Sequence, residues 1–599
     1  LPDLGRHAQL DFSFALAKGR GRYVCLKRLD DQLKYGAAGN SQTEIPLFDA
    51  TPDGAELYPA LLSAFADKSW DGERDSWSEA IDDGLWRGVT TDHRGCSNNK
   101  CSFFRQCPFF QARGRLDGVD VIVANHDLVL SDLSLGGGAV LPEPEDCIYI
   151  IDEAHHLPEK TQQHFSSSAR IRSAGDWVDN VATVLGSLTQ RFSRPDALVS
   201  LAANATHHGG EFASAMTEVG EVVAQLDFVP RDDTLAVHRF PHGVVPPALR
   251  VSAKAALAPL SELADDIGKA HELLQQAFAG ELGWERGFEA EDWLPVVGQL
   301  QTRALATMAL LADYADAKAG AEESAAAHAR WANDHGSDFE LVSAPIQPGA
   351  LLTDALWSRC FAAVCTSATL TAAGRFNRFL ERTGLQDITT QRIPSPFDFP
   401  SIASFTVPAM ESDPRDFQAH TAEVTALLPK LLKDDPSALV LFTSWRQMRA
   451  VVAELDPDVA ECAKVQGEAS KQALLDAHRN DVDAGRRSFI FGLASFSEGV
   501  DLPDDYCRHV IVVKLPFAVP DDPVDQALAE WAESQGKNAF YEIAVPDAAL
   551  RLVQACGRLI RHEGDYGRIT LLDKRIVTKR YGRDLIESLP PYKLDLNHA

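Results

Sequence analysis

The strongest constraint on the fold is a short apolar segment that ends in two adjacent carboxylates. Residues 146–151 (Asp-Cys-Ile-Tyr-Ile-Ile) are mostly apolar and predict a buried strand. Asp152 and Glu153 follow directly and open the string Asp-Glu-Ala-His. In an open α/β sheet, ligands bind outside the carboxyl ends of the strands. The segment therefore predicts a parallel α/β sheet with acidic groups at its ligand-binding edge.

The acid pair has two interpretations. One carboxylate can hold Mg²⁺, directly or through water, while its neighbour orients an attacking water molecule. The alternative is a solvated acidic turn that caps the next helix. The whole Asp-Glu-Ala-His string after an apolar strand is more specific than an acid pair alone, and it favours the first interpretation.

The composition is that of a folded protein with several domains. The chain has 599 residues, of which 45% are hydrophobic and 24% are charged, so a disordered class is excluded. It has no uninterrupted apolar stretch of the roughly 18 residues that a membrane helix needs, and no signal peptide at the amino end. We therefore expect a cytosolic protein.

The charge is strongly acidic overall, with one basic exception. The formal net charge is −29, which argues against a protein coated in positive charge but allows a local basic channel. Residues 551–584 contain nine Lys or Arg against four Asp or Glu. This segment indicates either an anion-binding surface or an ordinary solvated basic face.

Three cysteines lie in a polar, turn-rich segment that needs a covalent or metal link to hold its shape. They are Cys96, Cys101 and Cys107, within residues 94–108. Disulfides are disfavoured in a cytosolic protein, so metal ligation is the main interpretation. Three thiolates need a fourth ligand, and Cys25 is the best candidate by its order along the chain.

The identity of the metal stays open at this level. Tetrahedral zinc and a four-iron cluster both accept four cysteines. The spacings C-x4-C and C-x5-C differ from the short C-x2-C knuckle of zinc fingers, and Cys107-Pro108 is like the Cys-Pro of some ferredoxins. These details favour the cluster without excluding zinc.

The carboxyl half predicts a second parallel sheet. From about residue 360 onward, apolar strand patterns alternate with helical stretches. Residues 362–365 lead into the hydroxyl-rich residues 366–370, which either sense a nearby phosphate or cap the next turn. Residues 438–445 repeat the pattern and end in Trp445. This tryptophan has two interpretations: a platform on which a nucleic-acid base stacks, or a residue of the hydrophobic core or of a hinge.

A glycine between two acids follows a further predicted strand. Residues 488–492 are mostly apolar and lead towards Glu498, Gly499 and Asp501. Gly499 would let the backbone approach a ligand closely, with the two acids flanking it. We therefore expect these three residues to lie where the second sheet approaches a ligand.

Two arginines three residues apart form the last candidate group. Arg558 and Arg561 follow Gln554, and their spacing predicts that they share one face of a helix. A guanidinium presented to a phosphoryl group in transfer is an arginine finger. The alternative is a pair of surface arginines that form ion pairs with acids. The Gln and Gly that precede the arginines disfavour this alternative.

Together these strings resemble the iron-sulfur XPD/DinG group of superfamily 2 helicases. The resemblance covers nearly the whole chain and follows the motif order of the group. Its cluster ligands match Cys25, Cys96, Cys101 and Cys107, and its other motifs match residues 125–126, 152–155 (the DEAH box), 366–369, 496–501 and 554–561. Within the group, residues 14–26 look most like the bacterial DinG family.

The resemblance implies an ATP-dependent helicase that tracks 5′ to 3′ on single-stranded DNA. It implies a [4Fe-4S] cluster, ATP and Mg²⁺ as cofactors, with the cluster domain as a wedge at the duplex junction. The implied catalytic residues are Asp152, Glu153, His155, Gln554, Arg558 and Arg561, with Asp152 at the magnesium ion. The implied nucleotide contacts are Glu498, Gly499 and Asp501, and the implied cluster ligands are Cys25, Cys96, Cys101 and Cys107.

The resemblance also implies two RecA-like parallel-sheet motor domains with an iron-sulfur insertion and an α-helical arch insertion. The expected order is the remainder of motor domain 1 (1–24), cluster domain (25–112), motor domain 1 with the DEAH box (113–165), arch (166–345), end of motor domain 1 (346–374) and motor domain 2 (375–599). The arch region is rich in Ala, Leu and Glu at helical spacing, with few strand signals.

The sequence has no GxxxxGK[ST] loop, the cradle that this class of ATPase uses for phosphates. We expect that loop to lie upstream of Leu1, and we expect residues 1–599 alone to show negligible ATP turnover. Two rivals stay open, a YoaA-like paralogous repair helicase and a DNA-binding scaffold without a motor. Implied partners are single-stranded DNA, forked or RNA-DNA hybrid substrates and single-strand binding protein, for a monomer associated with the nucleoid.

Overall fold

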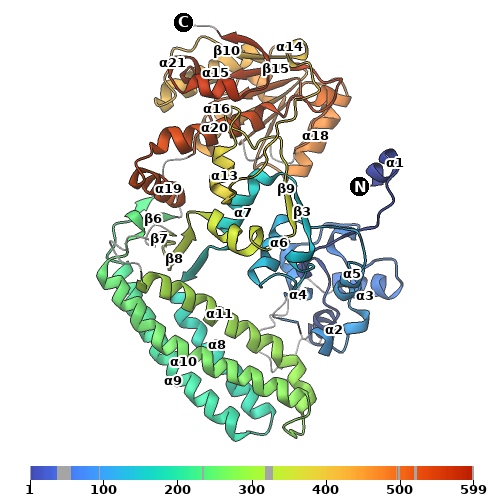
Figure 1. Ribbon diagram of the computed structural model, residues 1–599, viewed down its shortest axis with the longest axis vertical. Coiled ribbons are helices and arrows are strands. Elements are labelled where there is room, and N and C mark those ends of the chain that lie inside the picture. Colours follow the sequence, from blue (N-terminus) through green and yellow to red (C-terminus); the bar gives the residue numbers. More distant parts are fainter. Residues whose placement is uncertain are drawn as a thin grey trace. The chain divides into compact units, whose positions relative to one another are not determined.

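The computed structural model describes most of the chain, which divides into two units; Figure 1 shows its helices and strands. The described residues are 2–36, 56–92, 95–96, 98–231, 235–316, 328–493, 496, 500–518 and 522–596. The first unit comprises residues 1–143 and 160–346, and the second comprises residues 144–159 and 347–599. Within the described ranges, no helix is long and apolar enough to cross a membrane.

The first unit begins with a short parallel strand pair and a small helical subdomain. Strand β1 (Phe14–Leu16) pairs in parallel with β2 (Val121–Val123). The chain between them forms α2 (Leu26–Gly36), α3 (Leu57–Ala66), α4 (Asp83–Val89) and α5 (Pro108–Gly114). A separate core supports these helices and includes Leu29, Leu61, Trp70, Trp86 and Val89.

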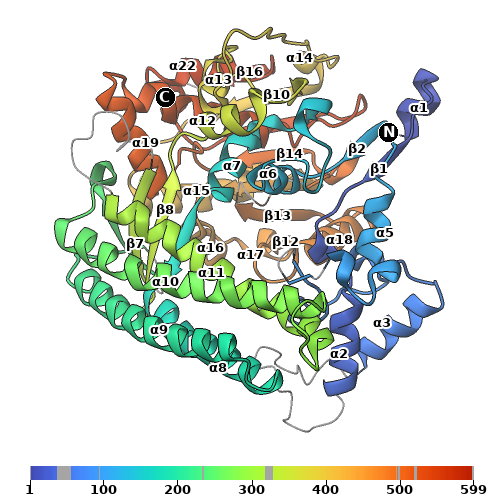
Figure 2. The same cartoon turned by 60° about the horizontal axis from the view of Figure 1, so that its bottom comes forward.

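Four long helices fill the middle of the first unit and lie side by side (Figure 2). They are α8 (Ile171–Arg191), α9 (Asp196–Val223), α10 (Pro247–Phe278) and α11 (Ala290–Asp316). One large core runs through all four helices, as the helical spacing of this region predicts.

An antiparallel sheet accompanies these helices, which the sequence did not lead us to expect. Its order is β4-β8-β7-β6-β5. The strands are β4 (Ser167–Arg170), β5 (Val229–Pro230), β6 (Ala236–Phe240), β7 (His328–Asp334) and β8 (Phe339–Pro345). β4 and β8 pair although the four long helices lie between them in the sequence. A pairing between such distant segments leaves little trace in the local residue pattern, from which the sheet would have had to be predicted.

The second unit contains a seven-stranded parallel sheet, which confirms the predicted α/β class. The strand order is β12-β13-β11-β14-β15-β10-β16, and all neighbours pair in parallel. The strands are β10 (Ala403–Val407), β11 (Ser437–Phe442), β12 (Ala463–Val465), β13 (Ser488–Leu493), β14 (His509–Val512), β15 (Gly567–Leu571) and β16 (Lys593–Leu596).

Both faces of this sheet are buried, and β11 shows why its sequence is apolar throughout. Leu439 and Leu441 belong to the core on one face. Ala438, Val440 and Phe442 belong to the core on the other face. Successive side chains of a strand point to opposite faces, so a strand covered on both sides reads as an uninterrupted apolar run.

Helices connect the strands of this sheet and cover it. The principal ones are α15 (Phe417–Leu431), α16 (Trp445–Ala453), α18 (Lys471–Asp483), α19 (Pro523–Ser534), α20 (Val545–Cys556), α21 (Arg575–Thr578) and α22 (Gly582–Ser588). The second unit also holds a parallel pair, β3 (Ile148–Ile151) with β9 (Ala362–Cys365). Both of these strands were expected from their apolar sequences.

Candidate functional site

The acid pair lies at the carboxyl end of β3, as predicted. Ile151 is buried at the end of the strand, whereas Asp152 and Glu153 are exposed. Glu153 has a left-handed backbone with φ of 47°, and its N–H donates to Asp152 Oδ1 at 2.9 Å. Thr366, which follows β9, accepts the N–H of Ala154 at 3.0 Å and donates to the Ile151 carbonyl at 2.9 Å. The backbone after β9 therefore fixes the turn that carries the acids.

Ser367 connects this turn to the hydroxyl-rich segment after β9. Its Oγ donates to Glu153 Oε2 at 2.9 Å and lies 2.8 Å from His155 Nδ1. Thr369 contacts the same Oγ through its N–H, at 3.1 Å, and through its own Oγ1, at 3.3 Å. The Ser367 hydroxyl therefore sits between the DEAH box and Thr369.

His155 faces both Ser367 and Glu153. Its Nδ1 lies 2.8 Å from Ser367 Oγ and 3.2 Å from Glu153 Oε2. In the tautomer that carries the proton on Nδ1, one N–H faces both oxygen atoms.

Gln554 extends the network to the last predicted motif. It lies near the end of α20, and its Nε2 donates to Thr369 Oγ1 at 3.3 Å. A continuous line of hydrogen-bonded side chains therefore runs from Glu153 through Ser367 and Thr369 to Gln554. All four residues belong to the second unit.

The prediction that Arg558 and Arg561 share a helix face is wrong. α20 ends at Cys556 and both arginines follow it in turns and irregular chain. The helix closes with a tighter turn, because the N–H groups of Arg558 and Leu559 donate to carbonyls three residues back, at 3.3 and 3.1 Å. Farther along the chain, the N–H groups of Arg561 and His562 donate to the Asp565 carboxylate at 2.6 and 2.8 Å.

The two guanidinium groups nevertheless converge on one point. Nη1 of Arg558 and Nη2 of Arg561 both donate to the carbonyl of Val500, at 3.4 and 3.0 Å. Arg561 Nε lies 3.8 Å from Asp501 Oδ1. The structure therefore brings the arginines to the segment that carries Asp501. The other two predicted nucleotide contacts, Glu498 and Gly499, lie outside the described residues.

Asp565 is a site residue that the sequence reasoning missed. It is 1% exposed, and besides the N–H groups of Arg561 and His562 it accepts the N–H of Asp504 at 2.8 Å. Burial works to raise the pKa of Asp565, but these three hydrogen bonds outweigh it and hold the pKa below its usual range. Asp565 thus fixes the backbone of Arg561 to the loop that follows Asp501.

Ser367 was noted only as part of a hydroxyl-rich strand exit, and its contacts were not predicted. The clustered hydroxyls of residues 366–369 were the available signal. Asp565 offered none, because a single acid in a polar loop has no distinctive pattern.

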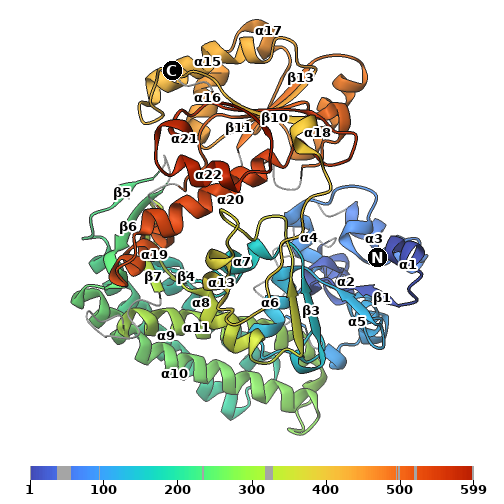
Figure 3. The same cartoon turned by 45° about the horizontal axis from the view of Figure 1, so that its top comes forward.

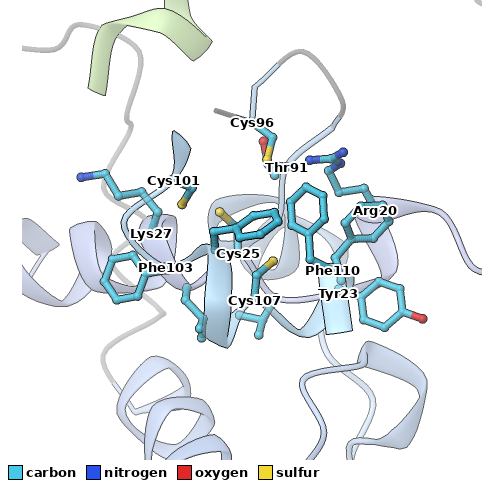
Figure 4. Close-up of a pocket in the computed structure, with 14 residues that line it drawn as sticks. Arg20, Tyr23, Cys25, Lys27, Thr91, Cys96, Cys101, Phe103, Cys107 and Phe110 are labelled. Atoms are coloured by element: carbon cyan, nitrogen blue, oxygen red, sulfur yellow. The ribbon is translucent and has the colours of Figure 1, made fainter. Parts of the chain in front are cut away.

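The four predicted cysteines line a single pocket in the first unit (Figure 4). Their sulfur atoms point into the same space (Figure 4). The pocket encloses about 400 Å³ that protein atoms do not fill, part of it open to solvent. Its other walls are mostly aromatic or apolar and include Tyr23, Phe103, Phe104, Phe109 and Phe110. Four thiols on an apolar wall form a soft ligand set.

Local backbone contacts place these cysteines. Cys25 precedes α2, and its N–H donates to the Val89 carbonyl at 2.7 Å, so it is tied to the small core of the subdomain. Cys107 is the N-cap residue of α5. Cys96 Sγ accepts the N–H of Asn98 at 3.3 Å, and the carbonyl of Asn98 accepts the N–H of Cys101 at 3.0 Å. Two short turns therefore present the last three thiols.

Burial raises the pKa of three of the four thiols, which favours their protonated form. It raises the pKa of Cys25 to about 11, with the neighbouring Cys96 and Cys101 adding to the shift. Burial also raises the pKa of Cys101 and of Cys107. Metal binding at this pocket would therefore release protons.

Within the described ranges, no three His, Cys, Asp or Glu side chains are arranged to hold a single metal ion. Four cysteine thiolates are a donor set that both tetrahedral zinc and a four-iron cluster accept.

Two family models match the chain. The model DEAD_2 matches residues 97–173, a range that contains two of the pocket cysteines, Cys101 and Cys107, and the DEAH box. The model of a helicase C-terminal domain matches residues 429–592, which contain Gln554 and both arginines.

Similar proteins cover nearly the whole chain. The ATP-dependent DNA helicase DinG of Photobacterium profundum is 35% identical over 619 residues, covering 100% of this chain and 86% of its own length. The DinG helicase of Escherichia coli is 30% identical over 611 residues, covering 98% of this chain and 82% of its own length. A solved XPD helicase matches 100% of this chain and 88% of its own, with a TM-score of 0.51 and 14% identity, and so supports the fold alone. The chain therefore belongs to the DinG family of superfamily 2 helicases.

Proposed function

We propose that this protein is an ATP-dependent DNA helicase. The observation that carries the proposal is the line of hydrogen bonds from Glu153 through Ser367 and Thr369 to Gln554. It connects the acid pair to the helix that leads into Arg558 and Arg561. A motor needs such a connection, because the groups that act on the nucleotide must respond to movement elsewhere in the protein. The relatives, which are named ATP-dependent DNA helicases, support the same activity.

Each side chain of the site would have a separate role in ATP hydrolysis. Asp152, exposed at the strand end, would hold Mg²⁺, which neutralises charge on the phosphates. Glu153 would orient the attacking water, with its carboxylate held by Ser367 and His155. Arg558 and Arg561 would approach the phosphoryl group as arginine fingers, while Gln554 would report its state through Thr369. Asp501, Glu498 and Gly499 would line the nucleotide from the same side.

A [4Fe-4S] cluster is proposed as the occupant of the cysteine pocket. Cys25, Cys96, Cys101 and Cys107 would hold it, and their placement on one apolar wall supports this. The cluster would supply a rigid link between α2 and the turns before α5, in a region that lacks long elements of its own. We propose that the subdomain thereby acts as a wedge against duplex DNA.

The finer assignments follow the family. We propose 5′ to 3′ movement on single-stranded DNA, action on forked or RNA-DNA hybrid substrates in repair, and a cytoplasmic monomer near the nucleoid that meets single-strand binding protein. The domain order given above remains our proposal for dividing the chain into cluster, arch and motor parts.

The test is an ATPase and unwinding assay on the complete gene product. We expect single-stranded DNA to stimulate ATP turnover, and we expect Glu153→Gln to abolish turnover while ATP binding persists. Ser358→Ala, which removes an exposed hydroxyl bonded only to the local Asp354 carbonyl in the described contacts, is the matched control. Turnover that ignores DNA, or DNA binding without any turnover, would reject the helicase and favour a scaffold.

A further inference from the structure

An aromatic cluster lies at the carboxyl edge of the seven-stranded sheet. It consists of Phe517, Phe540, Tyr541 and Tyr581. Phe517 follows β14, and Tyr581 follows β15 and precedes α22, so two neighbouring parallel strands lead into it. Phe540 and Tyr541 open a π-helical turn (Phe540–Ala544) that continues into α20. The carboxyl edge is where ligands of parallel sheets bind, and π-helical turns are common at functional sites.

The rings of the cluster contact one another continuously. Phe517 stacks on Phe540 with centroids 5.7 Å apart and an angle of 20° between the rings. Tyr581 lies 5.4 Å from Phe517 and 5.3 Å from Phe540. Tyr541 lies 5.3 Å from Phe540, edge to face. These contacts hold each ring in place, so the cluster is a rigid surface.

Two of the rings remain open to solvent. Phe540 is 41% exposed and Tyr541 is 43% exposed, although Phe517 and Tyr581 bury much of their surface against them. A single exposed aromatic needs no explanation, but a packed group with two adjacent open rings indicates a binding surface.

Charges of both signs surround the cluster, with Asp413 and Asp573 near Tyr581 as well as arginines, but two further cations adjoin it in the chain. The exposed Lys579 and Arg580 directly precede Tyr581. For these two residues, the described part of the chain gives no ion pair. Arg575 lies over the Phe517 ring, with its guanidinium carbon 5.7 Å from the centroid, and it is paired with Asp573. The basic segment 551–584, noted in the sequence of an otherwise acidic chain, therefore reaches the aromatic cluster.

Close packing of the backbone fixes the position of Tyr581. α20 and α21 both pack on α22 (Figure 3). At Gly582, directly after Tyr581, an added Cβ would lie 1.8 Å from the Ile576 carbonyl oxygen. Only glycine allows the chain to pass this point, so the position of Tyr581 is set by the junction of α21 and α22.

We propose that the aromatic cluster binds single-stranded DNA, with bases stacking on Tyr541 and Phe540 and phosphates contacting Lys579 and Arg580. This inference rests on the proposed function, and the residues of the cluster would be those with which the motor contacts the DNA strand. Stacking on aromatic rings tolerates any base, because every base has a π face. A helicase needs this tolerance, since it must move along any sequence. Charge complementarity favours a polyanion over an apolar protein partner.

The test is binding of a fluorescent oligodeoxythymidine to the complete gene product. Tyr541→Leu keeps apolar bulk but removes the π face, so we expect binding about tenfold weaker. Tyr541→Trp should restore it. The matched control is Tyr566→Leu, since Tyr566 is also an exposed tyrosine, at 58%, with a cation over its ring, but it lies at the amino end of β15.

Two further measurements separate stacking from charge and from folding defects. Replacing both Lys579 and Arg580 with Ala should lower the slope of log affinity against log salt by about 0.7 for each lost phosphate contact. An oligonucleotide containing 5-iodouracil should photocrosslink to Phe540 or Tyr541. Equal affinities for wild type and Tyr541→Leu, or crosslinks only at other sites, would overturn the inference. Failure of the wild-type protein to bind DNA would instead reject the proposed function itself.

Discussion

Replacing Ser367 by Ala removes the central contact between the acid pair and Gln554. The variant deletes the hydrogen bond to Glu153 Oε2 and both contacts with Thr369. A hydrogen bond to a charged group contributes roughly 1.5–3 kcal/mol. Glu153 is 59% exposed, so water would replace part of the loss and the lower limit applies. A loss of about 1.4 kcal/mol corresponds to about a tenfold decrease in kcat.

The assay is DNA-stimulated ATP turnover by the complete gene product, with kcat and KM measured separately. We expect kcat to fall while KM for ATP stays near the wild-type value, because the hydroxyl acts through Glu153. Ser367→Thr keeps the hydroxyl and should recover most of the rate. The Ser358→Ala control should leave both constants unchanged.

A double-mutant cycle tests whether the contacts form one line. If Ser367 and Gln554 act through Thr369, their two alanine substitutions should be non-additive. An unchanged kcat in Ser367→Ala, or fully additive effects in the double variant, would refute the reasoning.

Three other predictions concern stability and metal content. Asp565 has a lowered pKa in the folded state, so its stabilisation should be complete at neutral pH and decrease as the pH falls below about 4; urea midpoints should show this in wild type but not in Asp565→Asn. Cys101→Ser should lose the broad visible absorption of an iron-sulfur protein purified without oxygen, whereas a colourless, zinc-containing wild type would contradict the cluster. Gly582→Ala should destabilise the second unit by about 3 kcal/mol in chemical denaturation because of the clash with Ile576, whereas Gly564→Ala, with no neighbour near its Cβ position, should not.

Strand patterns and strand exits could be predicted because they depend on neighbouring residues. The apolar run of β11 is covered on both faces, so its position follows from composition alone. The acid pair after β3 could likewise be placed at a sheet edge. The four cysteines could be grouped because their residue type and polar setting are distinctive.

The contacts that organise the site could not be predicted in the same way. Ser367 lies more than two hundred positions from Glu153 along the chain, and no local pattern marks their pairing. The helix expected through Arg558 and Arg561 ends earlier, at Cys556, because the N–H groups of Arg558 and Leu559 donate to carbonyls three residues back. The spacing of the two arginines carries no information on where the helix ends.

The left-handed backbone of Glu153 makes the acid pair depend on the neighbouring strand. A non-glycine residue in this conformation costs roughly 1 kcal/mol, which the surrounding contacts must offset. Thr366 provides two of those contacts from the end of β9, one on each side of the acid pair. The conformation of the DEAH box is therefore a property of two strands, β3 and β9, and not of its own sequence alone.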